Sequence, residues 1–151
     1  MAARAAAVSP RAVAAAAAAG GGAAPPPPVV QYVVLRRDLW RGLGWPLGAV
    51  AAQACHAATA ALWLSREDEV TRRYCEGPAL DAMHKVVLEV KSEQQLVNLS
   101  EKLKDSGVVH KLWMEQPENI PTCLATKPYA KDDVAVLFKK YNLCKDPIGP
   151  K

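Results

Sequence analysis

Gln53 and His56 are the two strongly polar side chains in a run of small apolar residues, 49–58. On a helix, residues three apart lie on one face, which here also contains position 49. An amide can orient a substrate or a water molecule, and an imidazole can exchange a proton near neutral pH. A buried glutamine–histidine pair can equally be structural, so the spacing alone leaves both interpretations open.

The four cysteines and three histidines show no spacing typical of a metal site or a disulfide scaffold. This pattern predicts free thiols in a reducing compartment, hence a cytoplasmic location, and no metal. Cys55 precedes His56 directly, but neighbouring residues on a helix point about 100° apart. That geometry disfavours a thiol–imidazole dyad.

Residues 1–28 consist almost entirely of alanine, glycine, proline and arginine. Such a segment has no large side chains to bury, so we expect a disordered tail there. A single domain should follow over residues 29–145, with a short C-terminal tail over 146–151. Arg4 and Arg11, with no acidic residue near them, also fit a weak mitochondrial address as the alternative location.

The formal net charge is +4, and without the two tail arginines 17 basic residues remain against 15 acidic ones. This small excess is weak evidence for a nucleic-acid partner, which would need a local basic face. The longest apolar run, residues 47–64, is interrupted by polar side chains. We interpret it as a buried helix and expect no membrane partner.

The elements that must position these residues follow from hydrophobic periodicity. Near-continuous apolar residues predict a buried strand over 30–36, and further strands are expected over 85–90, 108–114 and 122–127. Helices are expected over 46–64, from Ser92 to Gly107 and over 131–141, with Ser92 and Gln95 as a capping box. The order β-α-β-α-β-β-α predicts an α/β fold, with a four-stranded mixed sheet covered on both faces.

Charged and polar residues follow the predicted strands. In such sheets, functional groups gather at the carboxyl ends of strands. These ends are expected at Arg36-Arg37-Asp38, Lys91, Glu115-Gln116 and Lys127.

Two segments together resemble the type II peptidyl-tRNA hydrolase family. Leu35-Arg36-Arg37-Asp38-Leu39 is similar to its strand ending in Arg-x-Asp-Leu, and residues 50–58 are similar to its Ala-Ala-Gln-x-x-His-Ala helix. The later strands and the crossover helix are in register over about residues 30–145. The resemblance implies a three-layer α/β/α sandwich that hydrolyses the ester between a peptide and the tRNA 3′ end. It also implies peptidyl-tRNA as partner, no cofactor, and a homodimer as a further expectation.

The resemblance also implies roles for residues of this chain. His56, Gln53 and Glu115 are the expected catalytic residues: His56 exchanges a proton or holds water, Gln53 orients the ester, and Glu115 orients a base or water. Arg36, Asp38 and Lys127 are expected to bind substrate, with Arg36 and Asp38 also open to interpretation as a structural pair.

The chain departs from the family at the first turn of the same helix. The family has a lysine where this sequence has Ala49, and an aspartate where it has Glu115. A missing cation removes stabilisation of a developing oxyanion. The alternative function is therefore a catalytically weak or inactive member that binds tRNA or a protein.

Overall fold

A computed structural model describes residues 22 and 25–145 of the chain. The predicted C-terminal tail, 146–151, lies outside the described residues, as does most of the predicted N-terminal tail. The chain enters the sheet at Val29, and the backbone N–H of Lys131 donates to the carbonyl oxygen of Pro28 over 2.9 Å.

One mixed sheet forms the middle of the molecule, with strands in the order β3-β4-β1-β2-β6 and β5 paired with β1. β1 and β2 are parallel, and the other pairs are antiparallel. The strands are β1 (Val29–Arg36), β2 (His84–Val90), β3 (His110–Glu115), β4 (Ile120–Thr126), β5 (Tyr129–Ala130) and β6 (Asn142–Leu143).

The expected number of four strands was wrong, because the sheet has six. The two additional strands, β5 and β6, contain two residues each. A strand this short cannot show the alternation of apolar and polar residues from which strands are predicted. The α/β class and the mixed character of the sheet are as predicted.

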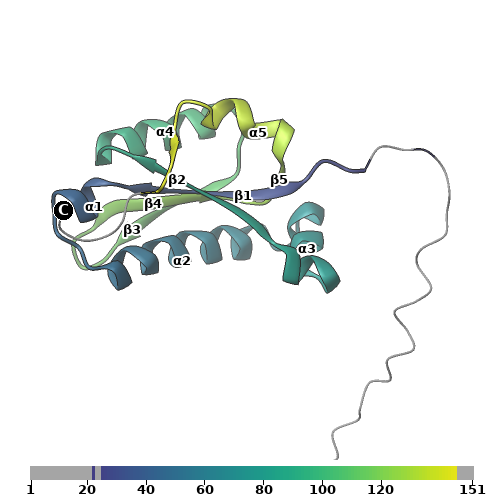
Figure 1. Ribbon diagram of the computed structural model, residues 1–151, viewed down its shortest axis with the longest axis horizontal. Coiled ribbons are helices and arrows are strands. Elements are labelled where there is room, and N and C mark those ends of the chain that lie inside the picture. The colour runs from purple at the N-terminus through teal and green to yellow at the C-terminus, as the bar shows by residue number, and fades with distance from the viewer. Residues whose placement is uncertain (1–21, 23–24, 146–151) are drawn as a thin grey trace, which may run out of the picture.

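Helices cover both faces of the sheet, giving three layers (Figure 1). α2 (Leu47–Leu64) lies on one face, and α4 (Glu93–Asp105) and α5 (Lys131–Phe138) lie on the other. The shorter helices are α1 (Asp38–Arg41), α3 (Glu69–Cys75) and the 3₁₀ helix η2 (Gly77–Ala82). The predicted cap of α4 is confirmed, since the Ser92 side chain accepts from the backbone N–H of Gln95.

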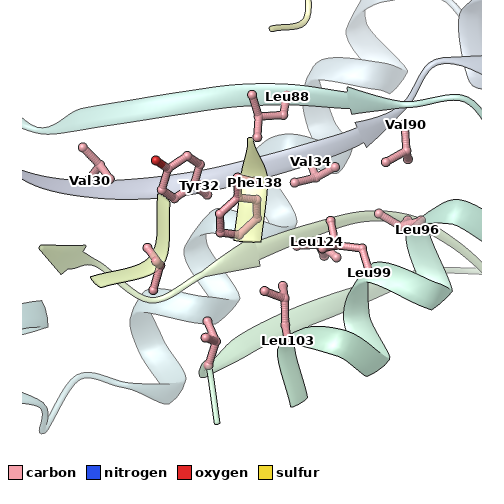
Figure 2. Close-up of a cluster of buried hydrophobic side chains, with 12 residues drawn as sticks. Val30, Tyr32, Val34, Leu88, Val90, Leu96, Leu99, Leu103, Leu124 and Phe138 are labelled. Carbon is pink, nitrogen blue, oxygen red and sulfur yellow. The ribbon is translucent and has the colours of Figure 1, made fainter. Parts of the chain in front are cut away.

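Large apolar side chains fill the layer between the sheet and the α4–α5 side (Figure 2). Leu96, Leu99 and Leu103 form the buried stripe of α4, as their spacing predicts. Tyr32 stacks on Phe138 with ring centroids 4.2 Å apart, which ties β1 to α5. Burying each such side chain stabilises the fold by about 1.5–3 kcal/mol.

The α2 layer is built differently, from small residues. Ala57, Ala58 and Ala61 pack against the sheet, and the buried Gln31 donates to the carbonyl oxygen of Ala58 over 3.1 Å. Small side chains let the helix backbone approach the strands closely. Among the described residues, α2 alone is long and apolar enough to cross a membrane by length and composition. Here it lies against β1, β3 and β4.

Candidate active site

Gln53 is the buried polar residue of α2, with 3% of its surface exposed. Its Nε2 donates to the carbonyl oxygen of Ala49 over 3.2 Å, and its Oε1 accepts from Thr122 Oγ1 over 2.7 Å. Because a carbonyl oxygen can only accept, the bond to Ala49 fixes which end of the amide is the nitrogen. One hydrogen of this nitrogen remains for a ligand.

His56 lies one helical turn later and is exposed. Its imidazole stacks on the Trp113 indole, with ring centroids 4.6 Å apart and ring planes inclined by 16°. Trp113 Nε1 in turn donates to Glu115 Oε2 over 2.8 Å. Residues two apart on a strand share a face, so β3 directs the indole and the carboxylate to the same side. Trp113 therefore links the two side chains expected to handle protons.

These groups open into one cavity of about 410 Å³ at the start of α2. It is lined by Trp45, Pro46, Ala49, Ala52, Gln53, His56, Glu115, Gln116 and Glu118. The three expected catalytic residues thus share a cavity. Its lining contains two carboxylates but no lysine or arginine. Ala49 is part of this lining, at the position where the family resemblance implies a lysine.

Arg36 and Asp38 form an ion-paired clamp, and neither residue lines this cavity. The Arg36 guanidinium makes a two-point contact with Asp38, at 3.1 and 2.7 Å, and also donates to Glu93 Oε2 and to the carbonyl oxygen of Pro121, both over 2.8 Å. Burial alone would lower the pKa of Arg36, but its bonds to Asp38 and Glu93 raise it. The buried guanidinium ties β1 to the starts of α1, α4 and β4, directly before Thr122.

Lys127 does not lie near these residues. Its Nζ donates to Asp68 Oδ1 over 3.1 Å and to the carbonyl oxygen of Pro128, and it lies 4.1 Å from the centroid of the Tyr129 ring. The reason is the direction of β4, which is antiparallel to β1. The carboxyl end of β4 is therefore at the edge of the sheet opposite Arg36, so the expectation that Lys127 would join the site was wrong.

Sequence reasoning missed two residues that shape the cavity. Thr122 holds the Gln53 amide, and Trp113 holds His56 and Glu115. The contact between Trp113 and Glu115 could have been predicted, because residues two apart on a strand share a face. Nothing in the sequence signals the pairing of Thr122 with Gln53, because the two residues are 69 positions apart.

The fold and cavity define a three-layer α/β protein with an amide, an imidazole and a carboxylate at one end of its sheet. Comparison with known proteins gives the family. Residues 29–144 match the family model "Peptidyl-tRNA hydrolase PTH2". The chain belongs to this family, as the sequence motifs predicted.

Individual relatives agree with this assignment. Proteins named "Putative peptidyl-tRNA hydrolase PTRHD1" from Mus musculus and Homo sapiens are 50% and 49% identical over 116 residues, which is 76% of this chain and 81% of each relative. A Methanothermobacter thermautotrophicus protein named "Peptidyl-tRNA hydrolase" is 29% identical over 103 residues, covering 65% of this chain and 84% of that protein.

Proposed function

We propose that this protein hydrolyses the ester between a peptide, or an N-blocked aminoacyl group, and the 3′ end of tRNA. The observation that carries this proposal is the shared cavity, in which Gln53, His56 and Glu115 line one space of about 410 Å³. Membership of the family and the names of the relatives supply the substrate class.

The proposed reaction begins with water held between His56 and the ester. His56 accepts a proton from the water as its oxygen attacks the carbonyl carbon. The carbonyl oxygen gains negative charge, which the remaining amide hydrogen of Gln53 stabilises. The bond from carbonyl carbon to ribose oxygen then breaks, and the ribose oxygen receives the proton from His56. The products are a free peptide carboxyl group and a tRNA 3′-terminal hydroxyl.

Glu115 has a supporting role in this scheme. One of its oxygens, Oε2, accepts from Trp113, which leaves Oε1 for the attacking water or for the imidazole. Its negative charge stabilises the imidazolium that forms during attack. The buried Arg36–Asp38 clamp contributes by fixing the start of β4, which presents Thr122 to Gln53.

The test is release of N-acetylaminoacyl groups from tRNA. We expect His56→Ala to lower kcat by roughly 10²–10⁴-fold, the usual contribution of a general acid–base. His84→Ala is the matched control, because His84 is also exposed but lies at the start of β2. Absence of turnover in the folded parent protein, or equal losses in both variants, would refute the hydrolase proposal.

The alternative, a member that binds tRNA with little catalysis, is favoured by one observation. Ala49 and two carboxylates face the cavity where a cation would stabilise the oxyanion. This alternative predicts saturable binding of N-acetylaminoacyl-tRNA without turnover. Turnover as fast as that of a relative with the lysine would exclude it.

A further inference from the structure

The candidate active site does not explain how an anionic tRNA would be held. Two glutamates and no lysine or arginine line its cavity. A tRNA backbone carries a negative charge at every phosphate, and neutralising these charges supplies much of the affinity of tRNA-binding proteins. The cations that bind the backbone must therefore lie outside the cavity.

A second cavity, of about 400 Å³, has the required charge. It contains Arg37, Lys91 and Lys140 against a single carboxylate, that of Glu89. Arg37 Nη1 pairs with Glu89 Oε1 at 3.1 Å, so the acidic side chain is already compensated. Neither Lys91 nor Lys140 forms an ion pair within residues 22 and 25–145, which leaves two exposed ammonium groups for an anion.

The fold assembles this cavity from segments distant in sequence. Lys91 directly follows β2, and β6 pairs antiparallel with β2, with Asn142 opposite Glu89. This pairing brings Lys140, two residues before β6, to the same end of the sheet. Asn98 from α4 adds an amide to the lining, and amides also donate to phosphate oxygens.

The cavity lies at the same end of the sheet as the candidate active site. β3, which provides Glu115, is separated from β2 by β4 and β1, and both β3 and β2 end at this edge of the sheet. Three strand spacings correspond to about 14 Å. To reach Lys91 from an ester at His56, the RNA backbone would pass over the strand ends from the α2 side of the sheet toward α4.

We propose that Arg37, Lys91 and Lys140 form a binding site for backbone phosphate near the 3′ end of tRNA, separate from the catalytic cavity. This inference rests on the proposed function for the identity of the RNA. Lys91 and Lys140 contact the phosphate, and the Arg37–Glu89 pair lines the same cavity. The site contributes to substrate binding and leaves the chemical step unchanged.

The first experiment measures binding of uncharged tRNA over a range of KCl concentrations by fluorescence anisotropy. We expect Lys91→Ala/Lys140→Ala to weaken binding roughly 10- to 100-fold at about 0.1 M salt and to reduce the slope of log Kd against log[salt] by about 2. Lys104→Ala/Lys131→Ala removes the same charge at the far ends of α4 and α5 and should bind like the parent protein. Equal effects of the two double variants, or no tRNA binding by the parent, would overturn the proposal.

The second experiment separates this inference from the hydrolase proposal. With N-acetylaminoacyl-tRNA, Lys91→Ala/Lys140→Ala should raise KM and leave kcat unchanged. With the N-acetylaminoacyl ester of adenosine, which has no phosphate, the variant and the parent should be equally active. Equal losses on both esters would overturn the phosphate site, whereas lysine-dependent tRNA binding without any turnover would support it and refute the hydrolase.

Discussion

Ala49 lies where a cation could assist the proposed hydrolysis. Its backbone carbonyl holds Gln53, and its methyl group faces the cavity. We predict that Ala49→Lys raises kcat by roughly 10²-fold, because one added donor to an oxyanion is worth about 2.7–4 kcal/mol. The backbone bond to Gln53 is retained in this variant, so the geometry of the amide should persist.

The control for this substitution is Ala51→Lys, which places the same charge on an exposed position of α2 that does not line the cavity. Release of N-acetylaminoacyl groups measures both variants. Unchanged kcat in Ala49→Lys, or the same gain in Ala51→Lys, would show that a cation at the first turn does not assist the reaction.

In the proposed reaction, Trp113 is a positioning residue, because it contacts His56 and Glu115. Trp113→Phe keeps a ring beneath His56 but removes the N–H that holds Glu115 Oε2. We predict a fall in kcat of roughly 10- to 100-fold with little change in KM, since small displacements of reacting groups have effects of this size. Trp63→Phe, at an exposed tryptophan elsewhere on α2, should leave both constants unchanged. A rise in KM alone would contradict the positioning role.

The candidate site could be predicted from the sequence only in part. Gln53 and His56 lie on one helix, so their spacing was enough to place them together. Glu115 was predicted from the family resemblance. Its partner Trp113 was predicted neither from residue spacing nor from the resemblance. Lys127 was misplaced because the direction of β4 depends on sheet pairing, which local sequence does not reveal.

At the scale of elements, long periodic segments were predictable and short ones were not. The stripe of Leu96, Leu99 and Leu103 identified α4, and its Ser92 cap identified the start. By contrast, the seven-residue α3 depends on contacts made after the chain folds, including the bond between its cap, Asp68, and Lys127. β6 forms by pairing with β2, and this pairing places Lys140, two residues before β6, at the proposed phosphate site.

The Asp68–Lys127 pair predicts how the attachment of α3 depends on pH. Burial tends to raise the pKa of Asp68, but the backbone N–H of Thr71 and the Lys127 ammonium outweigh it and lower the pKa. A lowered pKa in the folded state means that the contribution to stability is present above about pH 3.9, the ordinary value, and is lost as pH falls through the folded pKa. Low pH should therefore weaken the contact of α3 with the sheet.

Asp68→Asn tests this dependence, because asparagine can still cap the helix but carries no charge. We expect the parent to be more stable than the variant by less than about 1 kcal/mol near pH 7, since the Asp68 side chain is 36% exposed. The difference should vanish once the pH is below the lowered folded-state pKa of Asp68, in thermal unfolding followed by circular dichroism. Asp81→Asn, at an exposed position in η2, is the control, and a difference that persists below that pKa would contradict the argument.

At the scale of the whole molecule, the candidate site and the proposed phosphate site lie at one end of the sheet, and the entry of the chain into β1 lies at the other. The carboxyl ends of β1, β2 and β3 carry the clamp, the candidate active site and the proposed phosphate site. At the opposite end, Pro28 anchors the entry to β1 by accepting from Lys131. Bulk charge could not predict this division, because the net charge of +4 is low and only pairing brings Lys91 and Lys140 together.

The predicted domain boundary can be tested by two N-terminal deletions. Removing residues 1–24 should leave Tm unchanged, because a segment made mostly of alanine and glycine has few large side chains that could add burial. Removing residues 1–28 also deletes the acceptor for the Lys131 N–H, a bond worth about 0.5–1.5 kcal/mol, and should lower Tm by roughly 4 °C. Differential scanning calorimetry measures the Tm of both deletion variants, with the full-length protein as reference. If the shorter deletion lowers Tm as much as the longer one, folding energy comes from residues before Pro25, and the domain begins earlier than position 29.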